Sequence, residues 1–274
     1  GSWRRSPNVK KRWRHYTSVL VTGLQQSLVR RGVGFETLIA SFGQVAASER
    51  RADGHRFDLR DHVRALLFAQ LSNQRPWKPI ADNIEKLRDL FLDFEPDRLA
   101  AADPSELVAG LKALRCGNRS VLPQMEALAA NIGTLRRIEA TFGTVDAFAS
   151  HAPPDEVARK LSAPGPYKLR SIGPALALEY LRNVGIRASK PDLHVRRAIS
   201  AHRLGYTPGH PSEWEAYEVI DRLAVEGHVN PTYLDNLLWI FCAQDYGAIC
   251  GATPRCGDCE LAPSCHFPHS HAAT

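Results

Sequence analysis

The sequence predicts an all-α protein, and three observations support this prediction. Apolar residues recur at helical spacing along most of the chain, as at Val63, Leu66, Leu67 and Leu71. Short Pro/Gly stretches separate these runs, and no segment has the alternating pattern of a convincing strand. The composition of the 274 residues, 44% hydrophobic and 23% charged, is that of a globular protein and excludes a disordered or fibrous chain.

The expected helices follow one another along the chain with short connections. The first two, 17–31 and 35–48, are separated by two nearby glycines, and the third begins at Asp58, whose side chain suits an N-cap. The others are expected at 80–93, 104–114, 120–132, 134–140, 144–150, 154–162, 175–184, 192–203, 213–226 and 231–244. The last nine residues, 266–274, are expected to form a frayed tail.

Positive charge is concentrated in two parts of the chain. Residues 1–15 contain six Lys/Arg and no acid, and we expect them to form a flexible basic arm that binds DNA nonspecifically. Residues 159–203 contain ten Lys/Arg and two acids, whereas residues 204–274 contain two Lys/Arg and nine acids. A concentrated basic segment suits a groove for a polyanion, although solvated helix faces explain the same counts equally well.

Four of the six cysteines lie within sixteen residues: Cys250, Cys256, Cys259 and Cys265. The Gly, Pro, Asp and Ser residues between them favour an irregular coil that can point four sulfurs at one centre. Four thiolates bind structural zinc or an iron–sulfur cluster. Zinc ribbons usually carry two separated Cys-x2-Cys pairs, and the single pair here favours a cluster; two disulfides are the alternative. Cys116 and Cys242 are expected to be buried thiols.

A glycine-containing turn precedes the helix expected at 175–184. Its sequence is Leu169-Arg170-Ser171-Ile172-Gly173-Pro174-Ala175. Backbone N–H groups at such a turn, with the dipole of the following helix, suit a DNA phosphate without reading its sequence. Asp192 follows about twenty residues later at an expected helix start, where one helix and one loop can return its carboxylate to the turn. Taken alone, Asp192 is most simply explained as an N-cap.

The turn, the aspartate and the cysteine-rich coil occur in the order and approximate spacing found in helix-hairpin-helix DNA glycosylases. Over about residues 58–267 the chain resembles the endonuclease III/MutY branch, which carries a [4Fe–4S] cluster. The resemblance implies two helical domains that flank a DNA-binding cleft. A six-helix barrel-like domain with the helix-hairpin-helix would span 58–184, and 16–57 with 185–274 would form the iron–sulfur cluster domain. The four clustered cysteines would hold a structural [4Fe–4S] cluster.

The resemblance also implies roles for individual residues. Asp192 matches the catalytic carboxylate, which stabilises the cationic sugar or activates water. Gln70 matches a glutamine that enters the DNA gap left by a flipped base, with Leu71 beside it. Asn73, Gln74 and Trp77 are candidates for the base pocket, although a helix end before a proline would look much the same. The other candidate DNA contacts are Lys168, Arg170, Ser171, Gly173, Ala175, Arg196 and Arg197.

The chain departs from this family pattern at the turn and at the first cysteine gap. Bifunctional members carry a nucleophilic lysine where this chain has Ala175, and Arg170-Ser171 replace Pro-Gly. The gap between the first two cysteines is five residues where the family usually has six. Without a lysine at position 175 there is no obvious Schiff-base nucleophile, so we expect a monofunctional glycosylase that leaves an abasic site. The alternatives are a glycosylase/lyase that uses Lys168 or Lys190, and a damaged-DNA-binding module without chemistry.

The expected substrate is double-stranded DNA with one damaged or mispaired base. Uracil or thymine in a mismatch and an alkylated base both remain open. The chain contains no run of roughly 20 apolar residues that would span a membrane, and no apolar core follows its basic start as in a secretory signal. We therefore expect a soluble, cytoplasmic monomer associated with the bacterial nucleoid.

Overall fold

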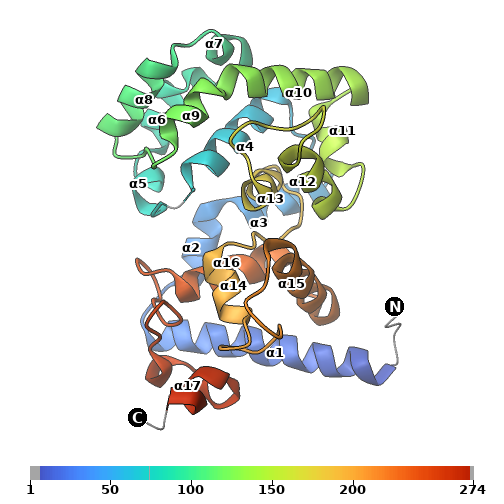
Figure 1. The fold of residues 1–274 in the computed structure, drawn as a ribbon, viewed down its shortest axis with the longest axis vertical. Helices are drawn as coiled ribbons and strands as arrows, with labels where there is room; N and C mark the ends of the chain where they lie inside the picture. Colours follow the sequence, from blue (N-terminus) through green and yellow to red (C-terminus); the bar gives the residue numbers. More distant parts are fainter. Residues whose placement is uncertain (1–6, 74, 272–274) are drawn as a thin grey trace. The chain divides into compact units, whose positions relative to one another are not determined.

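The structure, a computed structural model, describes residues 7–73 and 75–271, with side chains from residue 16 to residue 270 (Figure 1). Helix makes up 65% of the chain, and the described residues contain no strand. The predicted all-α class is therefore confirmed. Residues 1–6, Gln74 and 272–274 lie outside the described residues.

The chain divides into two compact units, which we describe separately. Of the described residues, those within 47–186 form the central unit, and 7–46 with 187–271 form the terminal unit. The boundary at residues 46 and 47 falls within α3 (Gln44–Ala52), so residues 47–57 group with the central unit instead of with the cysteine-rich C-terminal part. The reason is local: the guanidinium of Arg51 binds the Val184 carbonyl oxygen and the Asp146 carboxylate, both in the central unit.

The terminal unit is built on the long helix α1 (Pro7–Arg30), which packs against α15 (Glu213–Gly227) and α16 (Pro231–Cys242). Its apolar core joins these helices to α2 (Phe35–Phe42) and α14 (Leu193–Ile199). The cysteine-rich coil follows α16 and contains only short helical segments: η2 (Cys256–Asp258), η3 (Ala262–Ser264) and α17 (His266–His271).

The central unit is organised around the buried helix α4 (Leu59–Leu71), which packs against α13 (Pro174–Asn183). Helix α13 also packs against α12 (Pro154–Ser162). The other elements of this unit are α5 (Lys78–Ala81), α6 (Ile84–Leu90), η1 (Leu92–Phe94), α7 (Pro96–Ala100), α8 (Pro104–Ala113), α9 (Val121–Glu126), α10 (Leu128–Phe142) and α11 (Val145–Ser150).

A buried polar network connects α4, α11 and α13 within the central unit. His62 Nδ1 lies 2.5 Å from the Tyr180 hydroxyl, and both residues are almost fully buried. His62 Nε2 lies 3.6 Å from Asp146, which also forms an ion pair with Arg51. Burial lowers the pKa of His62 despite the nearby carboxylate, so the imidazole is neutral at pH 7. The network satisfies the buried Asp146 charge by pairing it.

Local sequence signals set several helix boundaries. Asp58 caps α4 as predicted, accepting the N–H of Asp61 at 2.9 Å within a reciprocal capping box. The single helix expected over 35–48 is broken at Gly43, whose φ of +72° ends α2 in the left-handed region.

Both chain ends differ from the expected arrangement. Residues 7–15 of the expected flexible arm form the first turns of α1. Residues 266–271 of the expected frayed tail form α17, and its first N–H donates to the Arg203 carbonyl oxygen at 2.8 Å. The prediction of a frayed tail is therefore wrong over 266–271.

Candidate functional site

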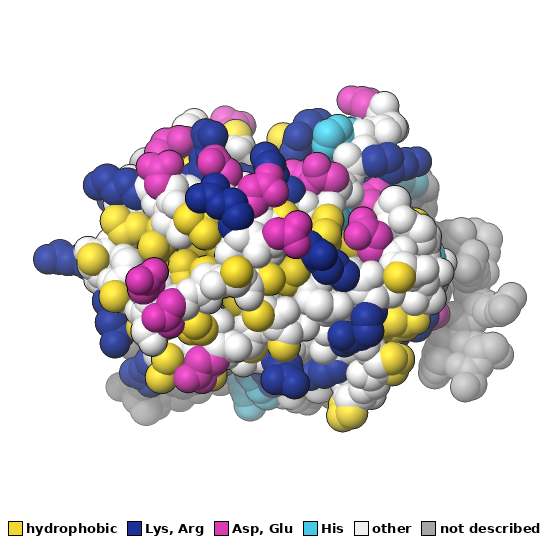
Figure 2. All heavy atoms as spheres, turned by 90° about the horizontal axis from the view of Figure 1, so that it is seen from above, with side chains coloured by type: hydrophobic (Ala, Val, Ile, Leu, Met, Phe, Trp, Pro, Cys, Tyr) yellow, Lys and Arg dark blue, Asp and Glu magenta, His cyan; other side chains and the backbone are white. Residues whose placement is uncertain are grey.

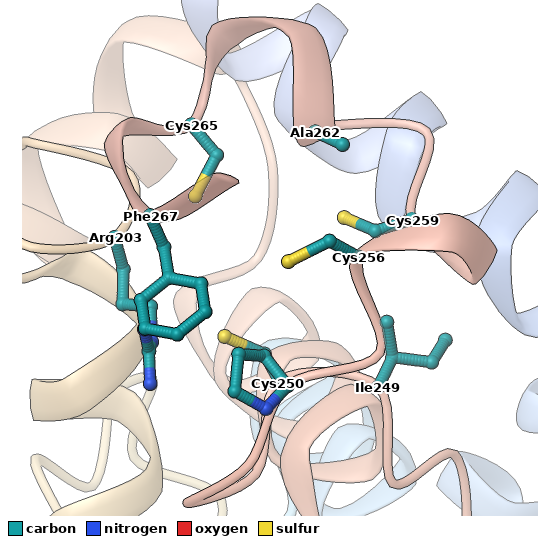
Figure 3. Close-up of a pocket in the computed structure, with 9 residues that line it drawn as sticks. Arg203, Ile249, Cys250, Cys256, Cys259, Ala262, Cys265 and Phe267 are labelled. Carbon is teal, nitrogen blue, oxygen red and sulfur yellow. The ribbon is translucent and has the colours of Figure 1, made fainter. Parts of the chain in front are cut away.

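The four clustered cysteines line one cavity in the terminal unit, together with Arg203 and Phe267. Figure 3 shows the four sulfur atoms pointing toward this cavity from the coil that follows α16. The turns η2 and η3 produce this convergence: Cys259 N donates to the Cys256 carbonyl oxygen (3.2 Å), and Cys265 N donates to that of Ala262 (3.2 Å). The four thiols therefore line the same cavity.

The environments of the four thiols are unequal. Burial raises the pKa of Cys259 to about 12 and also raises the pKa values of Cys256 and Cys265. The neighbouring Cys242 thiol lowers the pKa of Cys250, and the positive charge of Arg203 acts in the same direction. Buried thiols of this kind become thiolates when a metal displaces their protons.

The chemistry of the donor set fits a thiolate-bound metal centre. Arg203 is 7% exposed, and its buried Nε has no acceptor among the described residues although it lines the same cavity. A buried N–H without an acceptor is costly, and a bound anionic group would satisfy it. As they stand, no three His, Cys, Asp or Glu side chains in the described part of the chain have the geometry of a single-ion site.

Asp192 is the N-cap of α14 in the terminal unit. Its Oδ1 accepts the backbone N–H groups of His194 (2.8 Å) and Val195 (3.1 Å). Its Oδ2 has no hydrogen-bond partner among the described residues, and the residue is half-buried. The preceding segment is anchored to α16, because Lys190 N donates to Asp235 Oδ1 at 2.9 Å. Hydrogen bonds thus fix the carboxylate through Oδ1 and leave Oδ2 without a partner among the described residues.

The predicted turn connects α12 to α13 in the central unit. Asn131 holds it from both sides: Asn131 Oδ1 accepts the Arg170 N–H (2.7 Å), and Asn131 Nδ2 donates to the Arg170 carbonyl oxygen (3.1 Å). Ser171 has a φ of +58°, and Gly173 is the N-cap of α13. Both residues are exposed, and the backbone N–H groups of Gly173 and Ala175 have no acceptor among the described residues.

The basic side chains predicted to contact DNA fall into two classes. Arg170 is exposed at the turn. Lys168 is engaged in the turn itself, where its Nζ donates to the carbonyl oxygens of Ser162 (2.5 Å) and Ile172. Burial lowers the pKa of this lysine. In the terminal unit, Arg196 Nε donates to the Pro211 carbonyl oxygen (2.8 Å), and Arg196 and Arg197 are both half-buried.

The residues predicted to contact the flipped base lie at the C-terminal end of α4 and just beyond it. Gln70 and Leu71 are fully buried, so neither side chain reaches the surface of this conformation. Both polar atoms of the Gln70 amide are buried without partners in the described part of the chain. Asn73 is half-buried, and the Trp77 ring packs edge-on against Phe68 with centroids 6.2 Å apart. Gln74 lies outside the described residues.

Three residues that the structure adds to these sites were not predicted from the sequence. Asn131 and Arg203 lie far along the chain from the turn and the cysteines beside which they are found, whereas Cys242 precedes Cys250 by eight residues. An isolated asparagine, arginine or cysteine carries no spacing signal. Only the apolar surroundings of Cys242 were informative, and they correctly predicted a buried thiol.

Charge on the face of the molecule seen from the side of α7 and α10 is mixed. Figure 2 shows Lys and Arg side chains interspersed with Asp, Glu and apolar side chains on that face.

No helix in the described part of the chain is both long enough and apolar enough to cross a bilayer. We found no family model, curated protein or solved structure that matches the chain.

Proposed function

We propose that the protein is a DNA glycosylase that hydrolyses the N-glycosidic bond of one flipped-out base. The observation that carries the proposal is the Asp192 carboxylate, whose Oδ1 is held by two backbone N–H groups while Oδ2 is unengaged. Two hydrogen bonds to one oxygen fix the direction of the carboxylate. A carboxylate held in this way is preorganised to act on a positive charge that develops beside it.

The proposed reaction is hydrolysis at C1′ of the deoxyribose. The bond from C1′ to the base nitrogen breaks, and its electron pair leaves with the base, which takes up a proton. Positive charge develops on the sugar, where the Asp192 carboxylate stabilises it. Water attacks C1′ and loses a proton, for which Asp192 Oδ2 is the available base. The products are a free base and an abasic site.

The turn between α12 and α13 supports the binding of a nucleic-acid backbone. The free N–H groups of Gly173 and Ala175 at the start of the ten-residue helix α13 suit a phosphate oxygen. The exposed Arg170 adds a positive charge beside them. Such contacts fix position on DNA without selecting a sequence. The helix-hairpin-helix arrangement, with two helical domains that flank a DNA-binding cleft, is part of this proposal.

The buried amide of Gln70 supports a functional role near the end of α4. A glutamine with two buried polar atoms and no partner costs stability, which a structural role does not explain. DNA bases supply the donors and acceptors that this amide lacks. In the proposal, the end of α4 rearranges on binding so that Gln70 reaches the gap left by the flipped base.

The four cysteines would hold a [4Fe–4S] cluster as a structural cofactor. A single zinc ion requires every sulfur at about 2.3 Å, whereas in a cluster an iron stands between each thiolate and the centre. Sulfurs that surround a cavity suit the wider spacing of the cluster. When bound, the cluster supplies four iron–thiolate bonds that order the coil 250–265, and glycosidic hydrolysis needs no electron from it.

The contacts of Lys168 favour a monofunctional enzyme over a glycosylase/lyase. Its Nζ donates to two backbone carbonyl oxygens that close the turn, so an attack on the sugar would cost both hydrogen bonds. Position 175, at the start of α13, carries an alanine methyl group, which cannot form a Schiff base.

A screen of duplex oligonucleotides tests the proposal. Each duplex carries one uracil, mismatched thymine or alkylated base, and base release is followed by cleavage of the abasic product in alkali. We expect release from at least one duplex and no strand break before the alkali step. Tight binding to a damaged duplex without base release would contradict the proposal and favour a non-catalytic binding module.

A further inference from the structure

Arg203 has a buried donor that nothing in the described part of the chain satisfies. The residue lines the four-cysteine cavity and is 7% exposed. Its Nε–H is buried and has no hydrogen-bond acceptor among the described residues. A donor left unpaired in this way costs free energy, and the cost is higher on a charged group. An acceptor for this N–H is therefore expected in the cavity itself.

Contacts on two sides fix the guanidinium of Arg203. Nη2 donates to the carbonyl oxygen of Ala252 (3.4 Å), in the coil between Cys250 and Cys256. The guanidinium carbon lies 3.8 Å from the centroid of the Phe267 ring, and Figure 3 shows the two side chains together at one side of the cavity. Because the guanidinium is planar, these contacts also set the direction of its Nε–H.

The main chain holds Arg203 to the far end of the same coil. Arg203 N donates to the Ser200 carbonyl oxygen (3.0 Å) in the turn that follows α14. The Arg203 carbonyl oxygen accepts the N–H of His266 (2.8 Å), which directly follows Cys265. Arg203 is thus bonded to the coil both before Cys256 and after Cys265.

The lining of the cavity restricts what the acceptor can be. Besides Arg203 and the four cysteines, the described residues that line it are Ile249, Pro254, Ala262 and Phe267. None of these lining residues carries a carboxylate, so the partner of Arg203 there is not an Asp or a Glu. The anionic groups that this lining can supply are sulfurs, as the thiolates of a loaded metal centre.

We infer that Arg203 is a positioning residue of the metal centre: its buried Nε–H donates to an anionic sulfur of the loaded centre. This inference rests on the proposed four-cysteine centre and is independent of the proposed DNA chemistry. Four thiolates at one site accumulate negative charge, which a fixed cation and its hydrogen bond offset. The cation stabilises the more negative, reduced state of the centre and so raises its potential. It also reduces the tendency of the sulfur to take up a proton and leave the metal.

The experiment uses the full chain, purified without oxygen and loaded with iron and sulfide. Arg203→Met removes the charge and the donor but retains a long apolar side chain against Phe267, and Arg203→Lys retains the charge without the planar group. Arg31→Met is the matched control, because Arg31 pairs with Asp258 in the same coil (3.4 Å) but does not line the cavity. The readouts are the midpoint potential of the centre and the rate at which a chelator removes the metal.

We expect Arg203→Met to favour the oxidised state by about tenfold relative to the wild type, which is a shift of about 59 mV to lower potential for a one-electron couple. Metal loss to the chelator should be several-fold faster. Arg203→Lys should recover less than half of both changes, because an ammonium group cannot keep the ring contact and the hydrogen bond together. Arg31→Met should match the wild type. If Arg203→Met does not fold, the comparison of Arg203→Lys with the wild type and Arg31→Met carries the test.

Three results would overturn the inference. In the first, Arg203→Met and Arg31→Met have the same potential and the same rate of metal loss. In the second, Arg203→Lys equals the wild type in both readouts, so that charge alone suffices and the hydrogen bond is not required. In the third, the cysteines bind neither iron nor zinc, which also removes the proposed centre.

Two other results leave the inference standing. If the cysteines bind zinc only, the rate of metal loss carries the test and the [4Fe–4S] assignment alone fails. Failure of the glycosylase proposal leaves all of these readouts unchanged.

Discussion

The ion pair between Arg51 and Asp146 makes a quantitative prediction about stability and pH. Asp146 is 2% exposed. Burial by itself raises the pKa of this carboxyl group, but the neighbouring His62 and Arg51 side chains lower it from 3.8 to about 2. A folded-state pKa below the unfolded value stabilises the protein above pH 4, and this contribution is lost as the pH falls toward 2. At 1.36 kcal/mol per pKa unit, the contribution is about 2 kcal/mol.

The variant Asp146→Asn removes the charge and retains the size of the side chain. Leaving one partner of a buried pair uncompensated costs about 3 kcal/mol at the lower end of the usual range. We use the lower end because Arg51 keeps the Val184 carbonyl oxygen, at 2.9 Å from Nε and 2.7 Å from Nη2. The variant should also lack the loss of about 2 kcal/mol between pH 4 and pH 2.

Urea unfolding followed by circular dichroism at several pH values between 7 and 2 measures both effects. Asp97→Asn is the matched control, because Asp97 pairs with Arg136 at the surface with 85% of its side chain exposed. Removal of such a surface pair should change the free energy of unfolding by less than about 1 kcal/mol. The reasoning is refuted if Asp146→Asn and the wild type lose the same free energy between pH 4 and pH 2.

Three further predictions concern the turn and the end of α4. Ser171→Gly should raise the free energy of unfolding by about 1 kcal/mol, because glycine adopts the φ of +58° without strain; Ser171→Ala should give no gain in the same urea titration. Gln70→Leu should stabilise the protein by about 1 kcal/mol, because it removes a buried amide that has no hydrogen-bond partner. The same variant should bind a lesion duplex more weakly than the wild type. Unchanged binding would contradict the proposed role of Gln70. Borohydride should trap no covalent adduct with an abasic duplex, and an adduct lost in Lys168→Ala or Lys190→Ala would contradict the monofunctional assignment.

The fold was largely predictable because helix signals in this chain are local. The helix expected at 154–162 is α12, and the cap predicted at Asp58 begins α4. Errors arose where one residue changes the backbone direction. Gly43 divides an expected helix because its left-handed conformation depends on how the following chain packs, which periodicity does not report.

The candidate site was predictable only where its residues are close in sequence. The four cysteines lie within one coil, and their spacing indicated that they converge. Arg203, which lines the same cavity, could not be found in this way, since it comes from a distant part of the chain. The burial of Gln70 was missed for a related reason: a polar residue on an apolar helix can face either the core or a partner, and the sequence does not distinguish them.

The most direct test of the proposed chemistry is the single-turnover rate of base release by Asp192→Asn, on a lesion that the wild type excises. Asparagine caps a helix about as well as aspartate does, so α14 should remain intact while the charge is lost. Asp103→Asn, the same change at the N-cap of α8, is the matched control. We predict that Asp192→Asn binds the duplex with unchanged affinity and releases base at least about 100-fold more slowly. Wild-type rates in Asp192→Asn would contradict the account.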